Sequence, residues 1–149
     1  MTIHLSTAGE GPELDTKDAT VTVKASSADT GGYELFEIDA PRGPAVPPHA
    51  DPWTKGFYVL YGRFTVCLDG ELHDLGPGSF VHIPAGTSNT FTVHTPHAKF
   101  LVFTPDDAMG RFFREIDGIV PSDAPLPDTV PLLGDIASRH GVTFEELAP

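Results

Sequence analysis

Two stretches decide the fold of this chain: GPAVPPHADPWTKGFYVLYG at residues 43–62 and GSFVHIPAGTSNTFTV at residues 78–93. Each combines an apolar run of strand length with turn residues at its borders. Pro47 and Pro48 hold the start of the first stretch extended, because a proline fixes its own φ angle and disfavours helix in the residue before it. Both stretches therefore indicate a β-rich fold with tight turns.

The same alternation of short apolar runs and turns continues on both sides of these stretches. Strands are predicted at residues 20–25, 33–39, 57–60, 63–68, 71–75, 79–83, 89–94 and 99–104. Glycine and proline turns separate them, including Thr95-Pro96. Asp69-Gly70, between two alternating runs, predicts a two-residue hairpin. Short strands at this spacing are typical of a β-sandwich or a small barrel.

The spacing of the two stretches resembles the paired signatures of the cupin superfamily. The first signature is a Gly, a His-x-His, a Glu and a Gly, and these positions hold Gly43, His49, Asp51, Lys55 and Gly62. The second is a Gly, a Pro-x-Gly, a His and an Asn, and these positions hold Gly78, Pro84, Gly86, Asn89 and Val93. PPHADPW and LGPGSFVHIPAGT look like the small bacterial cupins allied to quercetin dioxygenases. The resemblance implies an all-β fold, a cupin jelly-roll barrel.

The resemblance also implies that four positions converge at the barrel mouth, where the family usually holds a metal with three His and one Glu. Here they are His49, Asp51, Lys55 and Asn89. A catalytic divalent metal requires about three good protein ligands. A Lys55 ammonium about 4 Å from such an ion would cost roughly 8 kcal/mol at an effective dielectric near 20. We therefore expect no tightly bound metal and no other cofactor.

Lys55 is expected to take the place of the metal, paired with Asp51. The leading hypothesis is a metal-independent enzyme that isomerises, cyclises or dehydrates a small, largely apolar or aromatic metabolite, as in natural-product tailoring. His49 and Asp51 would exchange protons, Lys55 would stabilise negative charge and Asn89 would orient the substrate. Three alternatives stay open: an inert ion pair in a former metal site, a quercetinase-like dioxygenase with an unusual ligand set, and a non-catalytic small-molecule-binding cupin.

Apolar side chains are expected to form the wall of the pocket. Phe57 and Val59 share a strand face with Lys55, and Phe91 shares one with Asn89. Further candidates for substrate binding are Phe36, Trp53 and His82. An aromatic barrel with a few polar groups at one end suits a largely apolar ligand.

The last third of the chain is predicted to be helical. Thr104-Pro105 has the form of a helix start, and Met109, Phe112, Phe113 and Ile116 form one apolar face that packs on the barrel until Gly118. A connector at 119–131 precedes a second helix at 132–140, which Gly141 ends. We divide the chain into an N-terminal arm (1–18), a cupin barrel (19–105) and a C-terminal helical tail (106–149).

Composition restricts the partners. A formal charge of -12 argues against nucleic acid and anionic membranes, so the expected partner is a small molecule. No segment approaches the roughly 18–20 apolar residues that span a bilayer, and no secretion signal is recognisable, so we expect a cytoplasmic protein. Cys67, the one cysteine, is expected to be a small core residue. The resemblance implies a homodimer in which residues 1–18 complete a partner's sheet.

Overall fold

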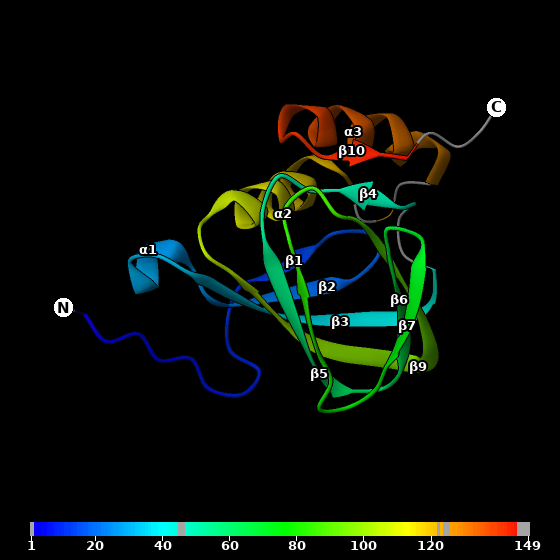
Figure 1. Cartoon of the computed structure of the whole chain (residues 1–149). Coiled ribbons are helices and arrows are strands. Elements are labelled where there is room, and N and C mark those ends of the chain that lie inside the picture. The colour runs from blue at the N-terminus through cyan, green and yellow to red at the C-terminus, as the bar shows by residue number, and fades with distance from the viewer. Residues whose placement is uncertain (1, 45–46, 122, 124–125, 146–149) are drawn as a thin grey trace.

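A computed structural model of the chain describes residues 2–44, 47–121, 123 and 126–145. Its strands are β1 (Glu13–Asp15), β2 (Thr20–Ala25), β3 (Glu34–Pro44), β4 (His49–Ala50), β5 (Lys55–Tyr61), β6 (Phe64–Leu68), β7 (Glu71–Leu75), β8 (Phe80–Ile83), β9 (Ser88–Thr104) and β10 (Thr143–Phe144). Its helices are α1 (Ser27–Thr30), α2 (Ala108–Ile119) and α3 (Leu126–Arg139). The strands roll around an apolar core, and α2 and α3 lie across one end of the roll (Figure 1).

The long strand β9 organises the sheet. It pairs antiparallel with β3 along one side, and with β5 and β6 on the other. β8 extends the sheet beyond β5, β7 extends it beyond β6, and β2 and β1 follow β3. Within the described residues the strand order does not return to its start, so the sheet is rolled without being closed. This is the predicted all-β jelly roll with a helical tail.

β9 corrects one prediction. Residues 89–94 and 99–104 are predicted as separate strands, but they belong to one strand that passes through Thr95-Pro96. At that point Pro41 of β3 pairs with His97 and Gly43 pairs with Val93, so the register shifts and β9 forms a bulge. A bulge accommodates a proline, because the missing N–H is not needed in the ladder.

β6 confirms one prediction and corrects another. Leu68 pairs with Glu71 across Asp69-Gly70, whose φ angles of 48° and 84° are both positive, as in the tight turns that close two-residue hairpins. The hairpin is therefore confirmed. Cys67, in contrast, is only partly buried. Side chains alternate along a strand, and because the neighbouring Val66 points into the core, Cys67 points outward.

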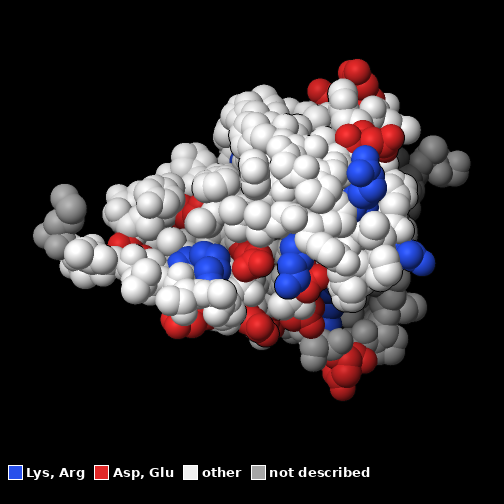
Figure 2. Space-filling view, turned by 90° about the horizontal axis from the view of Figure 1, so that it is seen from below, with Lys and Arg blue, Asp and Glu red and all other residues white. Residues whose placement is uncertain are grey.

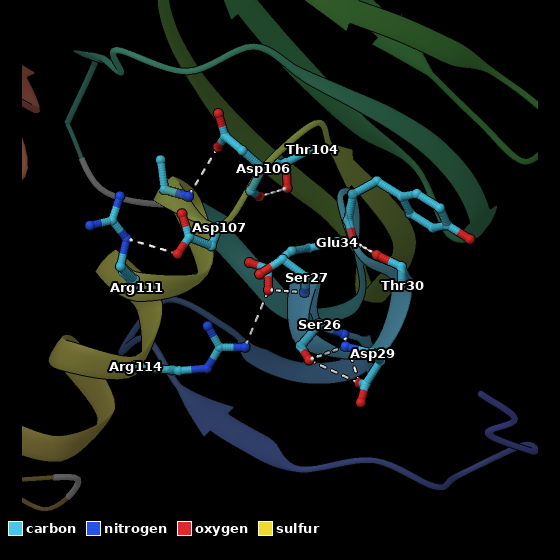
Figure 3. A network of polar contacts seen from close by, with 12 residues as sticks. Ser26, Ser27, Asp29, Thr30, Glu34, Thr104, Asp106, Asp107, Arg111 and Arg114 are labelled. Carbon is cyan, nitrogen blue, oxygen red and sulfur yellow. Dashed lines mark hydrogen bonds and ion pairs between the residues drawn. The ribbon is translucent and has the colours of Figure 1, made fainter. Parts of the chain in front are cut away.

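The helical tail forms as predicted in type but not in its boundaries. β9 continues through Thr104, and α2 begins at Ala108, whose N–H donates to the Asp106 carboxylate at 3.0 Å (Figure 3). The predicted apolar face is confirmed, with Met109 and Phe113 in the barrel core. α3 begins at Leu126 and tolerates Pro131, so half of the predicted connector is helical. No helix in the described ranges is long and apolar enough to cross a membrane.

Glu34, at the start of β3, ties two helices to the barrel (Figure 3). Its side chain is fully buried, and Oε2 accepts the Ser27 N–H of α1 at 2.8 Å and lies 3.5 Å from Arg114 Nη2 of α2. Gly110 of α2 passes so close that a Cβ there would lie 2.1 Å from Glu34 Oε1. These contacts hold α2 against one end of the roll. The short helix α1, which Ser26 and Asp29 cap reciprocally, is not among the predicted elements.

Acidic residues outnumber basic ones by 21 to 9. In the space-filling view of Figure 2, acidic and basic side chains are interspersed over a largely uncharged surface. On this face the basic side chains do not form the continuous strip that would follow a nucleic-acid backbone.

Gly62 and Gly78, two of the glycines that border the signature stretches, offer a matched test of the fold. Both have positive φ, at 82° and 86°, but a Cβ at Gly62 would lie 2.4 Å from the His97 carbonyl oxygen, whereas one at Gly78 would meet nothing within 4 Å. We expect Gly62→Ala to lower the free energy of unfolding by about 3–4 kcal/mol and Gly78→Ala by about 1–2 kcal/mol. Urea unfolding followed by Trp53 fluorescence measures both. Equal losses would contradict the role of the backbone contact at Gly62.

Candidate active site at the mouth of the barrel

The four polar residues predicted from the spacing meet at the end of the barrel that α2 and α3 cover. His49 of β4 pairs in register with Asn89 of β9, and Lys55 opens β5. Asp51 lies between β4 and β5, and its carbonyl oxygen accepts the Gly86 N–H at 2.8 Å. A backbone hydrogen bond from the turn at Gly86, in the second signature, therefore fixes the position of the loop at Asp51, in the first.

Lys55 is the centre of this group. Its Nζ donates to Asp51 Oδ2 at 2.6 Å and to Asn89 Oδ1 at 2.8 Å, and all three residues are only 4% exposed. Asn89 Nδ2 donates to the carbonyl oxygens of His49 and Thr87, both at 3.0 Å, which fixes the amide with its oxygen toward Lys55. An ammonium has three N–H groups, and these two bonds use two of them. Nζ also lies 5.5 Å from the centroid of the Phe57 ring, which borders the same cavity as Lys55.

These residues do not fit the divalent metal that most cupins hold. Lys55 Nζ contacts Asp51 Oδ2 and Asn89 Oδ1, the two oxygens that a metal at this place would need. A second cation beside the ammonium would be repelled. Among the described residues, no group of three His, Cys, Asp or Glu side chains is placed to hold an ion. The donor set that remains, one imidazole and one carboxylate already in an ion pair, falls short of three good ligands.

The imidazole of His49 has an acceptor beside each ring nitrogen. Its Nδ1 lies 3.2 Å from the Pro47 carbonyl oxygen, and because this is the shorter of the two contacts, we assign the hydrogen of the neutral ring to Nδ1 and the lone pair to Nε2. Burial lowers the pKa of His49 below its usual value, and Asp51 opposes that shift. Asp51 Oδ1 lies 3.5 Å from Nε2, close enough to stabilise the imidazolium once Nε2 has taken up a proton.

A largely apolar cavity lies beside these polar groups. The cavity has a volume of about 90 Å³ and is partly open to solvent. The barrel contributes Ile38, Phe57, Phe91 and Phe100 to its wall, and α2 contributes Met109, Phe112, Phe113 and Ile116. The apolar face of α2, expected only to pack on the barrel, therefore also roofs the cavity. The tail is part of the site.

The predicted pocket residues divide into two groups. Phe57 and Phe91 line the cavity, whereas Phe36, Trp53, Val59 and His82 do not. Val59 shares the inward face of β5 with Phe57 but lies deeper, in the closed core. Phe36 packs edge-on against Phe113, with ring centroids 5.5 Å apart, behind the cavity wall. Trp53 is likewise buried, with its ring 5.5 Å from Phe112.

His82 lies on the outer surface. Its neighbour Ile83 occupies the core, so alternation along β8 turns His82 outward. The sequence pattern allowed either set of side chains to line the barrel, and the structure selects Ile83. His82 has no place in the cavity.

Asp18 is a cavity residue that the sequence did not reveal. It lines the cavity with Thr16 and Ala19, so the predicted boundary between arm and barrel, at residues 18 and 19, falls within the cavity wall. Thr16 Oγ1 donates to Asp18 Oδ1 at 2.8 Å. Burial raises the pKa of Asp18, a shift that the Thr16 hydrogen bond, His49 and Lys55 only partly oppose. No motif marks this Asp in the polar run TKDAT.

Comparison with known proteins identifies the kind of domain that carries this site. The cupin domain family matches residues 35–103. Quercetin 2,3-dioxygenase of Bacillus subtilis (strain 168) is 29% identical over 110 residues, which cover 72% of this chain and 33% of that protein. The chain thus spans about a third of the length of this curated relative.

Two solved structures share the fold. The polyketide cyclase RemF from Streptomyces resistomycificus is 23% identical, with a TM-score of 0.63 over 70% of this chain and 80% of that one. KdgF from Halomonas sp. is 23% identical, with a TM-score of 0.62 over 70% of this chain and 94% of that one. The family match and the shared fold lead to one conclusion: residues 35–103 form a cupin domain.

Proposed function

We propose that this cupin is an enzyme that acts without a bound metal on a small, largely apolar or aromatic molecule by proton transfer. One observation carries the proposal: Lys55 takes the metal's place beside an apolar cavity that His49 also borders. An apolar pocket with a few polar groups at one end suits such a ligand. The shared fold of a polyketide cyclase supports natural-product chemistry by analogy alone.

His49 and Lys55 divide the chemistry. His49 Nε2 removes a proton next to a substrate carbonyl, and the remaining N–H of Lys55 stabilises the enolate oxygen that results. Return of the proton to another atom completes an isomerisation. Alternatively, the enolate carbon attacks a second carbonyl of the same molecule, and the alkoxide that forms takes up the proton from His49, which completes a cyclisation. Loss of water from this product then gives a dehydration.

Asp51 and Asn89 act through these two residues. Asp51 is not among the residues that line the cavity, and one of its oxygens is bound to Lys55. Its role is therefore to hold Lys55 and to stabilise the His49 imidazolium, in place of the predicted proton exchange. Asn89 borders the cavity, but both of its N–H groups bind carbonyl oxygens of the protein, so it positions Lys55 and does not orient the substrate.

Product mass distinguishes this function from its two competitors. The protein is incubated with a panel of hydroxylated aromatic compounds and linear polyketones, quercetin included, and products are identified by mass spectrometry. We expect a product of unchanged mass, or one lighter by a single water, formed equally with EDTA and under nitrogen. A product that carries two oxygen atoms from ¹⁸O-labelled dioxygen and requires an added divalent metal would establish a dioxygenase instead. Saturable binding without any product would establish a non-catalytic binding cupin.

The homodimer stays a prediction. Ile3 and Leu5, 92% and 79% exposed, lie on an N-terminal arm that extends away from the barrel (Figure 1). His4 and Ser6 attach the arm to β2 through the Lys24 carbonyl oxygen. Exposed apolar side chains on an extended arm are what a segment exchanged between two copies of the chain would present.

A further inference from the structure

Asp18 stands between two hollows of the molecule. On the inside it borders the cavity, together with His49 and Lys55. On the outside it borders a groove whose charged residues are Asp15, Lys17, Asp39 and His97. The side chain is only partly buried, in agreement with its place in the wall that separates the two.

The turn between β1 and β2 holds Asp18 in this wall. The turn closes when the Thr16 N–H donates to the Ala19 carbonyl oxygen at 3.1 Å, and Lys17 adopts a positive φ of 77°. Thr16 Oγ1 then donates to Asp18 Oδ1 at 2.8 Å. These contacts hold one carboxylate oxygen of Asp18 in place, at a position that borders both the cavity and the groove.

Asp18 also brings a carboxyl group to the cavity wall. Of the described residues that line the cavity, it is the one carboxylic acid, because Asp51 lies behind Lys55. Burial raises the pKa of Asp18 and lowers that of His49. Two titratable groups whose surroundings shift their pKa values in opposite directions are the usual arrangement of an acid and a base.

We propose that Asp18 is the second proton-transferring residue of this site and exchanges its proton with solvent through the outer groove. The inference rests on the proposed function and deepens it. His49 Nε2 takes one proton from the substrate, and the Asp18 carboxylic acid gives one proton to another substrate atom, so the product is an isomer. The Asp18 carboxylate then regains a proton from solvent in the groove, and the His49 imidazolium releases one.

Asp18→Asn tests this inference, because Asn keeps an oxygen that accepts from Thr16 but has no acidic proton. We expect kcat to fall about 100-fold or more, with little change in KM, and the alkaline limb of the pH–rate profile to disappear. The matched control is Asp74→Asn. Asp74 also accepts a threonine hydroxyl, that of Thr65 at 2.7 Å, but it is exposed on β7 and lies outside the cavity.

Thermal stability gives a readout that does not depend on turnover. A carboxyl whose pKa is raised on folding binds more protons in the folded state, so stability is lost as pH rises from the unfolded pKa, about 3.8, through the folded one. The charges that face Asp18 are those of Lys55 and His49 across the cavity and of the four groove residues. We expect Asp18→Asn to raise the Tm by a few degrees at pH 7 and to leave it unchanged near pH 3, while Asp74→Asn changes neither value.

The outcomes separate this inference from the proposed function. If His49→Gln is inactive but Asp18→Asn turns over substrate with the wild-type pH profile, Asp18 is no acid and the inference falls alone. If both variants retain wild-type turnover, the proposed function falls with it. A lower Tm of Asp18→Asn at pH 7 would contradict the raised pKa of Asp18 and overturn its role as the acid, whatever its turnover.

Discussion

Lys55→Met is expected to lower the free energy of unfolding by about 3–5 kcal/mol. The substitution leaves the Asp51 carboxylate 4% exposed and without its cation, and it removes the donor that Asn89 Oδ1 accepts from. The double variant Asp51→Asn, Lys55→Met removes both charges and should regain most of the loss. Urea unfolding of the wild type, both single variants and the double variant gives the coupling free energy of the pair.

An exposed ion pair provides the control. Arg111 Nε lies 3.4 Å from Asp107 Oδ2 on α2, at the same i, i+4 spacing as Lys55 and Asp51, but both side chains are largely exposed (Figure 3). Arg111→Met should change stability by about 1 kcal/mol or less. If Lys55→Met costs no more than Arg111→Met, the Lys55 pair is not the buried centre that its contacts describe.

His49→Gln is expected to reduce turnover about 10²–10⁴-fold, because glutamine accepts no proton at neutral pH. The lowered pKa of His49 also sets the acid limb of the wild-type pH–rate profile. Nε2 must be unprotonated to act as a base, so the rate should fall only at a pH below the usual histidine value of about 6.5. Measurement of kcat/KM from pH 4 to 9 with a substrate found in the panel tests both statements.

The lowered pKa of His49 also makes the free energy of unfolding depend on pH. Because the pKa of His49 is lower in the folded chain, the unfolded chain binds more protons below pH 6.5, and stability is lost as pH falls from there toward the folded pKa. His49→Gln should remove this dependence. His82→Gln is the control, since His82 is exposed on the outer face of β8, and it should leave turnover and the acid limb unchanged. An acid limb that persists in His49→Gln would assign the base to another residue.

The buried ion pair of Lys55 and Asp51 raises the question of why polar side chains occupy this end of the barrel. A buried ion pair rarely stabilises a fold more than apolar side chains of the same volume would. Here the pair holds an N–H at the edge of a cavity, next to a neutral imidazole and a carboxyl whose pKa is raised. Ionisable groups perturbed in this way gather at functional sites more often than elsewhere. The position of the pair therefore supports the proposed function.

The resemblance to the cupin signatures predicted the meeting of His49, Asp51, Lys55 and Asn89, because the spacing places these residues at the family's ligand positions. Gly86 shows the physical basis: its N–H bonds to the Asp51 carbonyl oxygen, so the turn of one stretch sets the position of the other. Alternation likewise placed Phe57 and Phe91 on inward faces. Strand alternation and turn conformation can be predicted from the sequence, because both depend on residues that are close together in the chain.

Two features could be learned only from the tertiary structure: how deeply each inward side chain lies in the barrel, and which distant segments of the chain meet at the cavity. Alternation puts Val59 on the same face as Phe57, but only the rolled sheet shows that Val59 lies in the closed core and Phe57 at the cavity. Asp18, which no local pattern marks, reaches the site because β1 and β2 turn beside it. α2 becomes the roof because Glu34 and Arg114, far apart in the chain, meet at its side. The sequence by itself thus determined the cupin barrel and its four substituted positions, while contacts between distant segments determined which residues face the ligand.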